Sequence, residues 1–303
     1  MIETPAISPL LKPSATWRDY WSLTKPSIVL LVLVTGLPAM MMAQQGMPPL
    51  SLVLLTLGGT ALAAGGAATI NMYVDRDIDG IMERTAKRPS VTDTISPGQI
   101  LAFGLILSVA STLMLALGVN LLAAAVSVGS ILFYAGFYTM YLKRTTPHNT
   151  VIGGVAGAVA PLIGWAAVRG EIGLPAWILF MVIFLWQPPH FWALAIYRVD
   201  DYAKASIPML PNTHGIEYTR WQMLIYTALL IPFTLVLYPM QQAGGIYLAT
   251  AVVLDTIYLV KTVQLLRNPS RPASMKLFFF SILYLMVLFI ALVIDLGVRY
   301  GIA

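Results

Sequence analysis

The chain contains no cysteine and few charged side chains. Its 303 residues include 18 Lys and Arg and 13 Asp and Glu, which make up 10% of the sequence, against roughly 25% in an average soluble domain. Without cysteine there is no disulfide framework, no thiolate metal site and no cysteine nucleophile. Hydrophobic residues make up 58%, more than one soluble core can bury, so we predict that much of the chain faces lipid.

Long stretches of the sequence carry no charged residue at all. The two longest, 26–74 and 94–142, can each hold two membrane-spanning helices, because a bilayer core about 30 Å thick needs roughly 20 apolar residues in a helix. Turn-forming runs at 44–49 and 117–120 divide them. We therefore predict an all-α, polytopic membrane protein with nine transmembrane helices. The predicted spans are 27–45, 51–70, 98–117, 121–141, 150–168, 175–196, 221–239, 245–264 and 277–297.

The basic residues predict how the chain is oriented. If the N-terminus is cytoplasmic, every Lys and Arg except Arg169 and Arg299 falls on the cytoplasmic side, as the positive-inside rule requires. We predict a flexible cytoplasmic tail, 1–24, followed by a single transmembrane domain, 25–303, whose C-terminus lies outside. The net charge of +5 is spread over separate loops beside the spans, so the expected partner is the lipid bilayer and not nucleic acid.

A polar cluster follows the second predicted span. Asn71, Asp75 and Asp79 are spaced four residues apart, so on a helix they share one face. Mg²⁺ is usually held by one or two protein carboxylates together with water and substrate phosphates, and this set can supply such ligands. The alternative is a solvated acidic turn. We favour metal binding, because like charges at four-residue spacing destabilise a helix unless a cation compensates them.

Basic residues lie next to this cluster. Arg84, Lys87 and Arg88 follow it directly, and Lys143 and Arg144 follow the fourth predicted span. Arg offers planar, bidentate contacts to phosphate oxygens and Lys offers a point charge, so the five side chains are candidate diphosphate ligands. The alternative role is ordinary anchoring at the cytoplasmic membrane surface. Proximity to the acidic cluster favours the diphosphate role.

A second acidic cluster, Asp200-Asp201, follows the sixth predicted span on the same side of the membrane. We expect the clusters to converge, so that Asp201 joins Asn71, Asp75 and Asp79 as a metal ligand and catalytic residue. Ionisation of an allylic diphosphate needs a metal and basic groups that neutralise the leaving group, beside an apolar cavity that excludes water. The residues alone thus predict metal-dependent diphosphate chemistry at the cytoplasmic face of a helical bundle.

Three motifs together carry a family resemblance. Their residues are Asn71, Asp75 and Asp79; Arg84, Thr85, Arg88 and Pro89; and Tyr138, Thr139, Leu142, Lys143, Arg144, Thr146 and Asn149. This pattern resembles the UbiA superfamily of intramembrane prenyltransferases. The likeness extends from about residue 20 to the end of the chain. It implies a UbiA-like bundle of nine helices with an Mg²⁺-dependent prenyl diphosphate site.

Within that superfamily, segments 186–195 and 200–211 resemble the branch that farnesylates heme. The resemblance implies transfer of the farnesyl group of farnesyl diphosphate to the vinyl group of heme b (protoheme IX), which gives heme O and diphosphate. It also implies a multi-pass protein of a bacterial plasma (inner) membrane, with its active site facing the cytoplasm. A heme A synthase or an oxidase assembly factor is a candidate protein partner.

The second motif departs from the Asp-x-x-x-Asp pattern of many relatives. Tyr197 stands four positions before Asp201, and Lys204 stands four positions after Asp200. The second motif therefore offers fewer carboxylate ligands than that of a typical quinone-branch enzyme. Either a single metal ion suffices or Asp200 takes part, and the sequence leaves both readings open.

The heme acceptor has its own candidate residues in and after the sixth span. Gln187 and His190 lie inside that span, and Tyr197 and Arg198 lie at its end. Ionisable residues within spans are functional candidates by default. The neutral imidazole of His190 can ligate heme iron or hydrogen-bond a porphyrin carboxylate; the alternative is a hydrogen bond to a carbonyl group of a neighbouring helix.

Three rival functions stay open at this point. A quinone-branch prenyltransferase would share the metal residues, but segment 186–195 argues against it. An alcohol phosphotransferase needs an Asp-Gly-x-x-Ala-Arg run, whereas 79–84 reads Asp-Gly-Ile-Met-Glu-Arg. A transporter tends to place charges near mid-membrane at broken helices, whereas the acidic motifs here lie at span ends.

For Asp255 and Asp295, inside the last two spans, we predict interhelical polar contacts.

Overall fold

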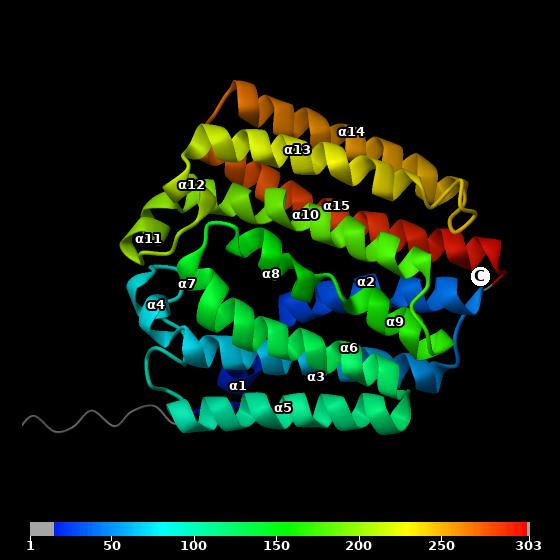
Figure 1. The fold of residues 1–303 in the computed structure, drawn as a ribbon, viewed down its shortest axis with the longest axis horizontal. Helices are drawn as coiled ribbons and strands as arrows, with labels where there is room; N and C mark the ends of the chain where they lie inside the picture. The colour runs from blue at the N-terminus through cyan, green and yellow to red at the C-terminus, as the bar shows by residue number, and fades with distance from the viewer. Residues whose placement is uncertain (1–14, 302–303) are drawn as a thin grey trace, which may run out of the picture.

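The computed structural model describes residues 15–301, which are almost entirely helical (Figure 1). This part of the chain contains no strand, so the all-α prediction is confirmed. The elements are α1 (Trp17–Leu23), α2 (Pro26–Gln44), α3 (Leu50–Val74), α4 (Arg76–Ile81), α5 (Pro97–Gly118), α6 (Leu121–Ile131), η1 (Leu132–Leu142), α7 (Lys143–Thr145), α8 (Asn149–Gly157), α9 (Ala160–Arg169), α10 (Leu174–Tyr197), α11 (Val199–Lys204), α12 (Leu210–Thr213), α13 (Ile216–Leu235), α14 (Gly245–Arg267) and α15 (Arg271–Arg299).

Eight helical stretches among the described residues are long and apolar enough to cross a membrane. They are α2, α3, α5, the run from α6 through α7, the α8–α9 pair, α10, α14 and α15. The helix that falls short is α13. It is 20 residues long but carries Glu217, Arg220 and Gln222 in its first two turns. It packs between α10 and α14 and holds most of the predicted seventh span, 221–239, so the predicted count of nine depends on it.

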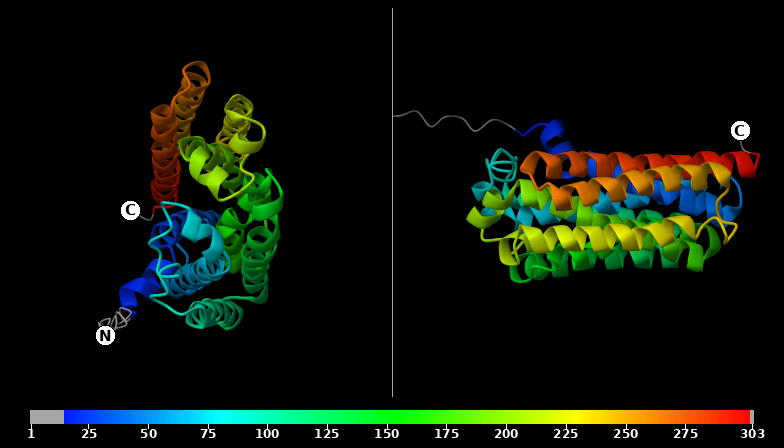
Figure 2. Two further views of the ribbon diagram at one scale, coloured as in Figure 1. Left: turned by 90° about the vertical axis from the view of Figure 1, so that its left-hand side faces the viewer. Right: turned by 90° about the horizontal axis from the view of Figure 1, so that it is seen from above.

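The long helices run side by side along the longest axis of the molecule (Figures 1 and 2). One group consists of α10, α13, α14 and α15, and α2 joins it to α3 and α9. The largest cluster of buried apolar side chains lies around α10, which is also the most enclosed of the candidate spans. A helix so enclosed is apolar on every side because protein surrounds it, whereas the outer helices are apolar because lipid does.

The helices α3 and α5 make the most extensive contact of any pair. Small residues allow it: a methyl group added at Gly66 would lie 2.6 Å from Ser108 Oγ and 2.9 Å from the Gly104 carbonyl oxygen. Close backbone approach at small residues is the usual way helices pack in a bilayer. This contact fixes α3, whose last turn carries Asn71 and leads into Asp75 and Asp79.

Two of the long helical runs are irregular. The run that begins at α6 changes into the π-helix η1 over its last turns, and the run α8–α9 is interrupted at Ala158 and Val159. A third helix, α10, stays continuous although Pro188 and Pro189 remove two backbone donors from its interior. Such defects are tolerated in spans where neighbouring groups satisfy the backbone.

The N-terminal segment enters the bundle through a short helix. Residues 1–14 of the predicted tail lie outside the described residues. The α1 helix begins at a cap in which the Thr16 N–H donates to the Asp19 carboxylate at 2.8 Å, and its last residue, Leu23, is buried beside Met72 of α3. It therefore fixes the start of α2 relative to the end of α3. The division into a tail and one transmembrane domain stays a prediction.

Most of the short helices gather at one end of the long axis. Figure 1 shows α4, α7, α11 and α12 at its left, whereas the C-terminus lies at the right. The described chain also begins toward the left end, near α1. Termini at opposite ends are what an odd number of crossings requires. Which end faces the cytoplasm stays a prediction from the basic residues.

Candidate active site

The three residues of the first motif lie on one helical face, as predicted. The Asp75 N–H donates to the Asn71 carbonyl at 2.9 Å, and the Asp79 N–H donates to the Asp75 carbonyl at 2.8 Å. The helical pattern thus continues across the junction of α3 and α4. Asn71, Asp75 and Asp79 are only 4%, 1% and 3% exposed, which excludes a solvated acidic turn. Carboxylates are buried in this way only when they are paired or bind a cation.

Asp75 is at the centre of the site. Its Oδ2 accepts a hydrogen bond from Asn71 Nδ2 at 2.7 Å and one from Lys143 Nζ at 2.5 Å. Its Oδ1 is buried and has no hydrogen bond within the described part of the chain; it forms a long ion pair with the Arg144 guanidinium, 3.8 Å away. A buried carboxylate oxygen without a donor is costly, and it is a ligand position that a cation can take.

Lys25 completes the site, and our sequence interpretation missed it. It precedes α2, and its Nζ donates to Asn71 Oδ1 at 2.9 Å. Burial, together with the nearby cations Arg88 and Lys143, lowers the pKa of Lys25 to about 7, against the attraction of the two buried carboxylates. Its backbone is left-handed, with φ of 53°, which is uncommon for a lysine. The one sequence signal is its place as the last charge before a long apolar stretch.

Asp79 is paired with one of the predicted diphosphate ligands. Arg88 Nη1 lies 2.5 Å from Asp79 Oδ2, and the buried Thr85 hydroxyl donates to the Asp79 carbonyl oxygen at 2.8 Å. The loop after α4 is thereby folded back over the motif. Arg84 and Lys87 of the same loop are exposed.

Arg144 has a partner that the sequence analysis did not consider. Its two terminal nitrogens lie 2.7 and 2.8 Å from the two oxygens of Asp77, the bidentate geometry that Arg prefers with carboxylates. The hydrogen bond from Arg144 lowers the pKa of Asp77. Asp77 stands between Asp75 and Asp79 in sequence but is 62% exposed, because it falls on the other face of the helix.

The π-helix η1 brings a hydroxyl group into the site. Thr139 donates to the Tyr134 carbonyl five residues earlier at 2.7 Å and accepts a hydrogen bond from Asn71 Nδ2 at 3.1 Å. Segments of π-helix are rare and frequently lie at functional sites. Here the wider turn precedes Lys143, so one irregular segment positions both a hydroxyl group and a cation against α3.

The two acidic motifs converge, although their carboxylates do not touch. Ile78 and Met82 pack with Ala195, Ile207 and Met209 in one small buried cluster, which joins the α4 region to the segments on either side of α11. No hydrogen bond or ion pair among residues 15–301 joins Asp201 to the first motif.

Each carboxylate of the second motif has its own Arg. Asp201 pairs with Arg198 at 3.0 Å, and Asp200 pairs with Arg271 of α15 at 2.8 Å. Burial raises the pKa of the neighbouring Tyr202, and the charges of Arg84 and Arg198 oppose this rise. Since Arg84 belongs to the first motif's loop, this charge interaction is a second sign that the two motifs are close.

The predicted acceptor residues fall into two pairs. Gln187 and His190 are buried in α10: the Gln187 amide donates to the Gly154 carbonyl at 2.8 Å, and His190 contacts Ser281 of α15. Tyr197 and Arg198 end the helix, and the Arg198 guanidinium lies over the Tyr197 ring, 5.6 Å from its centroid. One ring nitrogen of His190 thus contacts a serine hydroxyl rather than a helix carbonyl, and the role of His190 as an acceptor contact stays a prediction.

The donor set of the first motif fits Mg²⁺. The described residues hold no group of three His, Cys, Asp or Glu placed to bind a metal, and the first motif has two carboxylates and one amide. Mg²⁺ commonly takes only one or two carboxylates and completes its shell with water and substrate phosphates. The unpartnered Asp75 Oδ1 marks one such position.

Comparison with known proteins relates most of the chain to one family. The model of the UbiA prenyltransferase family matches residues 32–288. A protoheme IX farnesyltransferase of Stutzerimonas stutzeri is 47% identical over 281 residues, which cover 93% of this chain and 94% of that protein. A protein of the same name from Symbiobacterium thermophilum is 49% identical, with 92% and 94% covered.

Solved structures share the fold. One described as digeranylgeranylglyceryl phosphate synthase superposes with a TM-score of 0.77 at 19% identity, covering 92% of this chain and 98% of that chain. A UbiA homolog from Archaeoglobus fulgidus, solved with GPP and Mg²⁺, superposes with a TM-score of 0.63 at 18% identity, covering 91% and 99%. Prenyl diphosphate and Mg²⁺ are therefore bound by a protein of this fold.

Proposed function

The chain belongs to the UbiA prenyltransferase family, and on that premise we propose that it transfers the farnesyl group of farnesyl diphosphate to the vinyl group of heme b. The products are heme O and diphosphate. Relatives near half identity over more than nine tenths of the chain are named for this activity. The enzyme is accordingly a membrane-bound prenyltransferase of heme O biosynthesis.

The row of buried polar side chains at the junction of α3 and α4 is the proposed metal site. Asn71, Asp75 and Asp79 would hold Mg²⁺, and Asp201 would approach from α11 when substrate binds. The metal ion, when bound, supplies positive charge that stabilises the leaving diphosphate. Asp75 Oδ1, buried without a donor, supports the metal assignment.

The basic side chains around this row would bind the diphosphate oxygens. Lys143 and Arg88 now pair with Asp75 and Asp79, and Lys25 donates to Asn71. A metal ion on the carboxylates would release these cations, so each is already in place to turn toward a phosphate oxygen. The remaining candidate diphosphate ligands are Arg84, Lys87 and Arg144.

The apolar interior would protect the reaction from water. When the bond between the allylic carbon and oxygen breaks, the positive charge needs an acceptor carbon nearby and no competing nucleophile. The terminal carbon of the heme vinyl group attacks the allylic carbon, and a water oxygen then bonds to the other vinyl carbon and loses a proton. Gln187, His190, Tyr197 and Arg198 are the proposed acceptor contacts, since they line α10 up to the second motif.

The proposed setting is the plasma (inner) membrane of a bacterium, with the site facing the cytoplasm. The basic loops beside the site support this orientation, and the relatives are bacterial. A heme A synthase or an oxidase assembly factor is the proposed partner, because the product is very apolar and needs a consumer within the same bilayer.

The test is mass spectrometry of hemes from membranes that contain the protein. Membranes are incubated with heme b, farnesyl diphosphate and Mg²⁺, with and without a chelator. We expect a chelator-sensitive heme that carries a hydroxyethylfarnesyl group. If heme is untouched while a hydroxybenzoate or naphthoate is prenylated, the family stands and the heme acceptor is wrong.

A further inference from the structure

The imidazole ring of His190 is held on three sides. Its faces stack on Trp186 and on Phe278, with ring centroids 4.4 and 4.5 Å away and planes within 22° of parallel. Phe191 packs edge-on at 4.9 Å, and Nδ1 lies 2.7 Å from Ser281 Oγ. The ring cannot turn without breaking several of these contacts, so the direction of its remaining nitrogen is fixed.

The hydrogen bonds of Ser281 decide which ring nitrogen carries the proton. The Ser281 hydroxyl donates to the Phe278 carbonyl oxygen at 2.6 Å. A hydroxyl has one proton, and two oxygens this close would repel each other without a proton between them. Toward His190 the serine oxygen is therefore the acceptor and Nδ1–H is the donor. A neutral imidazole protonated at Nδ1 has its lone pair on Nε2.

That lone pair has no partner in the described protein. No hydrogen bond joins Nε2 to any group in residues 15–301, since the only polar contact of the ring is the one to Ser281. His190 is 7% exposed, and Nε2 is not among the fully enclosed polar atoms without a partner. Because the ring is held in place and the Nε2 lone pair is free and accessible, Nε2 can act as a Lewis base inside the membrane region.

We propose that His190 Nε2 is the axial ligand of the iron of the heme acceptor, and that Ser281 is the positioning residue that fixes the Nδ1–H tautomer. This rests on the proposed function, which makes heme the acceptor. A histidine that binds a metal almost always donates its other N–H to an oxygen, and His190 does so to Ser281. Trp186 Nε1 donates to the Ser281 carbonyl at 2.8 Å, so the serine is itself anchored.

The depth of His190 suits this role. It lies seven residues before Tyr197 in α10, about 10 Å along the helix axis at 1.5 Å per residue. The end of α10 adjoins the acidic motifs. An iron bound to Nε2 would therefore lie within about 10 Å, measured along the helix axis, of the end of α10 that adjoins those motifs.

The experiment titrates the full-length purified protein, in lipid nanodiscs, with ferric heme and records absorption and EPR spectra. We expect the wild-type protein to give histidine-ligated heme. His190→Ala and the bulkier His190→Gln should lose that signature and bind heme at least about tenfold more weakly, and added imidazole should restore the signature in His190→Ala. Metal-free protoporphyrin IX should bind the wild-type protein and the variants equally.

Ser281 and a second histidine provide the matched comparisons. Ser281→Ala should weaken heme binding about tenfold and shift the spectrum of bound heme, and Ser281→Thr should restore both, which a purely structural serine would not do. His214, an exposed residue whose Nδ1 also meets a hydroxyl, that of Thr213 at 2.9 Å, is the control, and His214→Ala should bind heme like the wild type.

The failures are distinguishable. A wild-type spectrum and affinity in both His190 variants would overturn the axial ligand while leaving farnesylation of heme intact. Spectral loss in the His190 variants with an unchanged spectrum in Ser281→Ala would overturn the positioning role. A wild-type enzyme that does not farnesylate heme in the mass-spectrometry test would instead refute the proposed function.

Discussion

Buried carboxylates lie at both ends of the bundle, but they are satisfied in different ways. At the end with the short helices, Asp75 and Asp79 pair with the long side chains of Lys143 and Arg88. At the opposite end, Asp295 of α15 accepts hydrogen bonds from backbone N–H groups at the start of α14. The same residue type thus serves two purposes in one fold.

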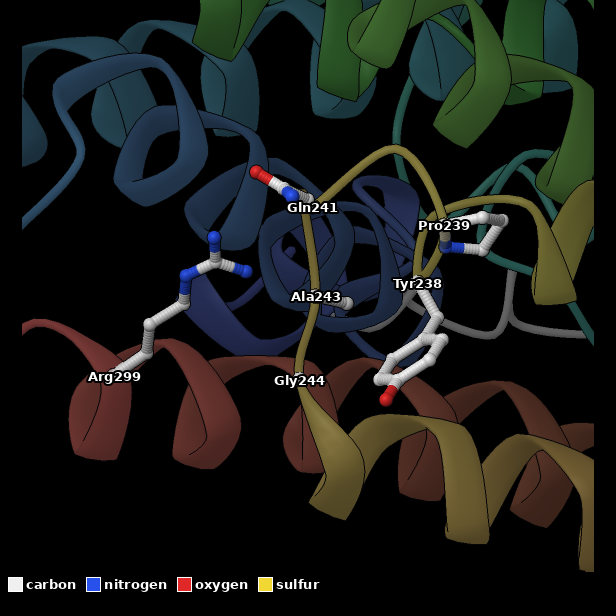
Figure 3. Close-up of a pocket in the computed structure, with 6 residues that line it drawn as sticks. All are labelled: Tyr238, Pro239, Gln241, Ala243, Gly244 and Arg299. Atoms are coloured by element: carbon white, nitrogen blue, oxygen red, sulfur yellow. The ribbon is translucent and has the colours of Figure 1, made fainter.

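The environment of Asp295 is a fixed one. Its oxygens accept from the N–H groups of Gly244, Ile246 at 3.0 Å and Tyr247 at 3.2 Å, so it caps the helix α14 from a neighbouring helix. A pocket beside this cap is lined by Gly244 and by Arg299. Figure 3 shows the Arg299 guanidinium standing apart from the Tyr238 ring, with no acidic residue among the labelled side chains.

The difference shows what separates a structural carboxylate from a reactive one. Backbone donors cannot move away without unwinding a helix, so Asp295 has one set of partners. Lys and Arg side chains can rotate from a carboxylate to a phosphate at little cost once a metal ion replaces them. We therefore propose that Asp75, a buried acid with flexible cationic partners and one oxygen without a hydrogen bond, is the carboxylate that acts on the substrate.

The largest expected effect is that of Asp75→Asn. Removing this charge should lower turnover by on the order of 10²–10³-fold or more, because it takes away an electrostatic group that acts on the leaving diphosphate. Turnover is measured as farnesylated heme per enzyme, and thermal unfolding reports the fold. Asp77→Asn is the matched control on the exposed face. An equal loss in that variant would contradict the assignment of Asp75 to the metal.

Lys143→Met comes next, with Lys25→Met as its counterpart. Each change removes one charge-assisted contact worth about 1.5–3 kcal/mol, so turnover should fall roughly tenfold to one-hundred-fold. Methionine keeps most of the side-chain length and adds no new charge. Measuring KM for farnesyl diphosphate checks the role. Wild-type KM and turnover in both variants would mean that these lysines serve only to pair the acids.

Asp295→Asn should act on stability alone. Replacing a carboxylate oxygen by an NH₂ group sets donor against donor at the start of α14, which should lower the free energy of unfolding by about 1–3 kcal/mol. Turnover below the melting temperature should stay that of the wild type. The loss of stability is measured by following unfolding in detergent through tryptophan fluorescence. A severe loss of turnover in the folded variant would contradict the purely structural role of Asp295.

The smallest effect is expected for Arg271→Gln. Its ion pair with Asp200 joins side chains that are 52% and 65% exposed, and pairs of that kind contribute about 0–1 kcal/mol. The free energy of unfolding should therefore change by less than about 1 kcal/mol. The free energies of unfolding of the wild type and the variant are compared at low and high salt, because salt should screen the ion pair and remove any difference between the two proteins. A larger loss would place Asp200 in the site rather than at its rim.

Most of the fold could be predicted because lipid imposes a simple pattern. The uncharged stretches predicted the positions of the long helices to within a few residues, and the four-residue spacing of Asn71, Asp75 and Asp79 predicted their shared face. Both are local properties of the chain. The count of nine spans depends on α13, where Glu217 and Arg220 interrupt the apolar sequence.

Partners across the bundle could not be predicted in the same way. Nothing in the sequence indicates that Lys25 contacts Asn71, 46 positions away. Nor does it indicate that the Arg144 guanidinium pairs with Asp77. The π-helix at Thr139 has no composition signal either. These features depend on how α2, α3 and η1 pack, and packing is a property of the whole molecule.

The sequence by itself determined the class of molecule and predicted metal-dependent diphosphate chemistry, because apolar length, charge placement and residue spacing act locally along the chain. The heme acceptor was predicted from the family resemblance. Only the tertiary structure decided which cation faces which carboxylate, and that His190 is clamped between Trp186 and Phe278 with its proton directed to Ser281. The pairings of Asp75 with Lys143 and of His190 with Phe278 and Ser281 join helices far apart in sequence, and only close packing sets their distances.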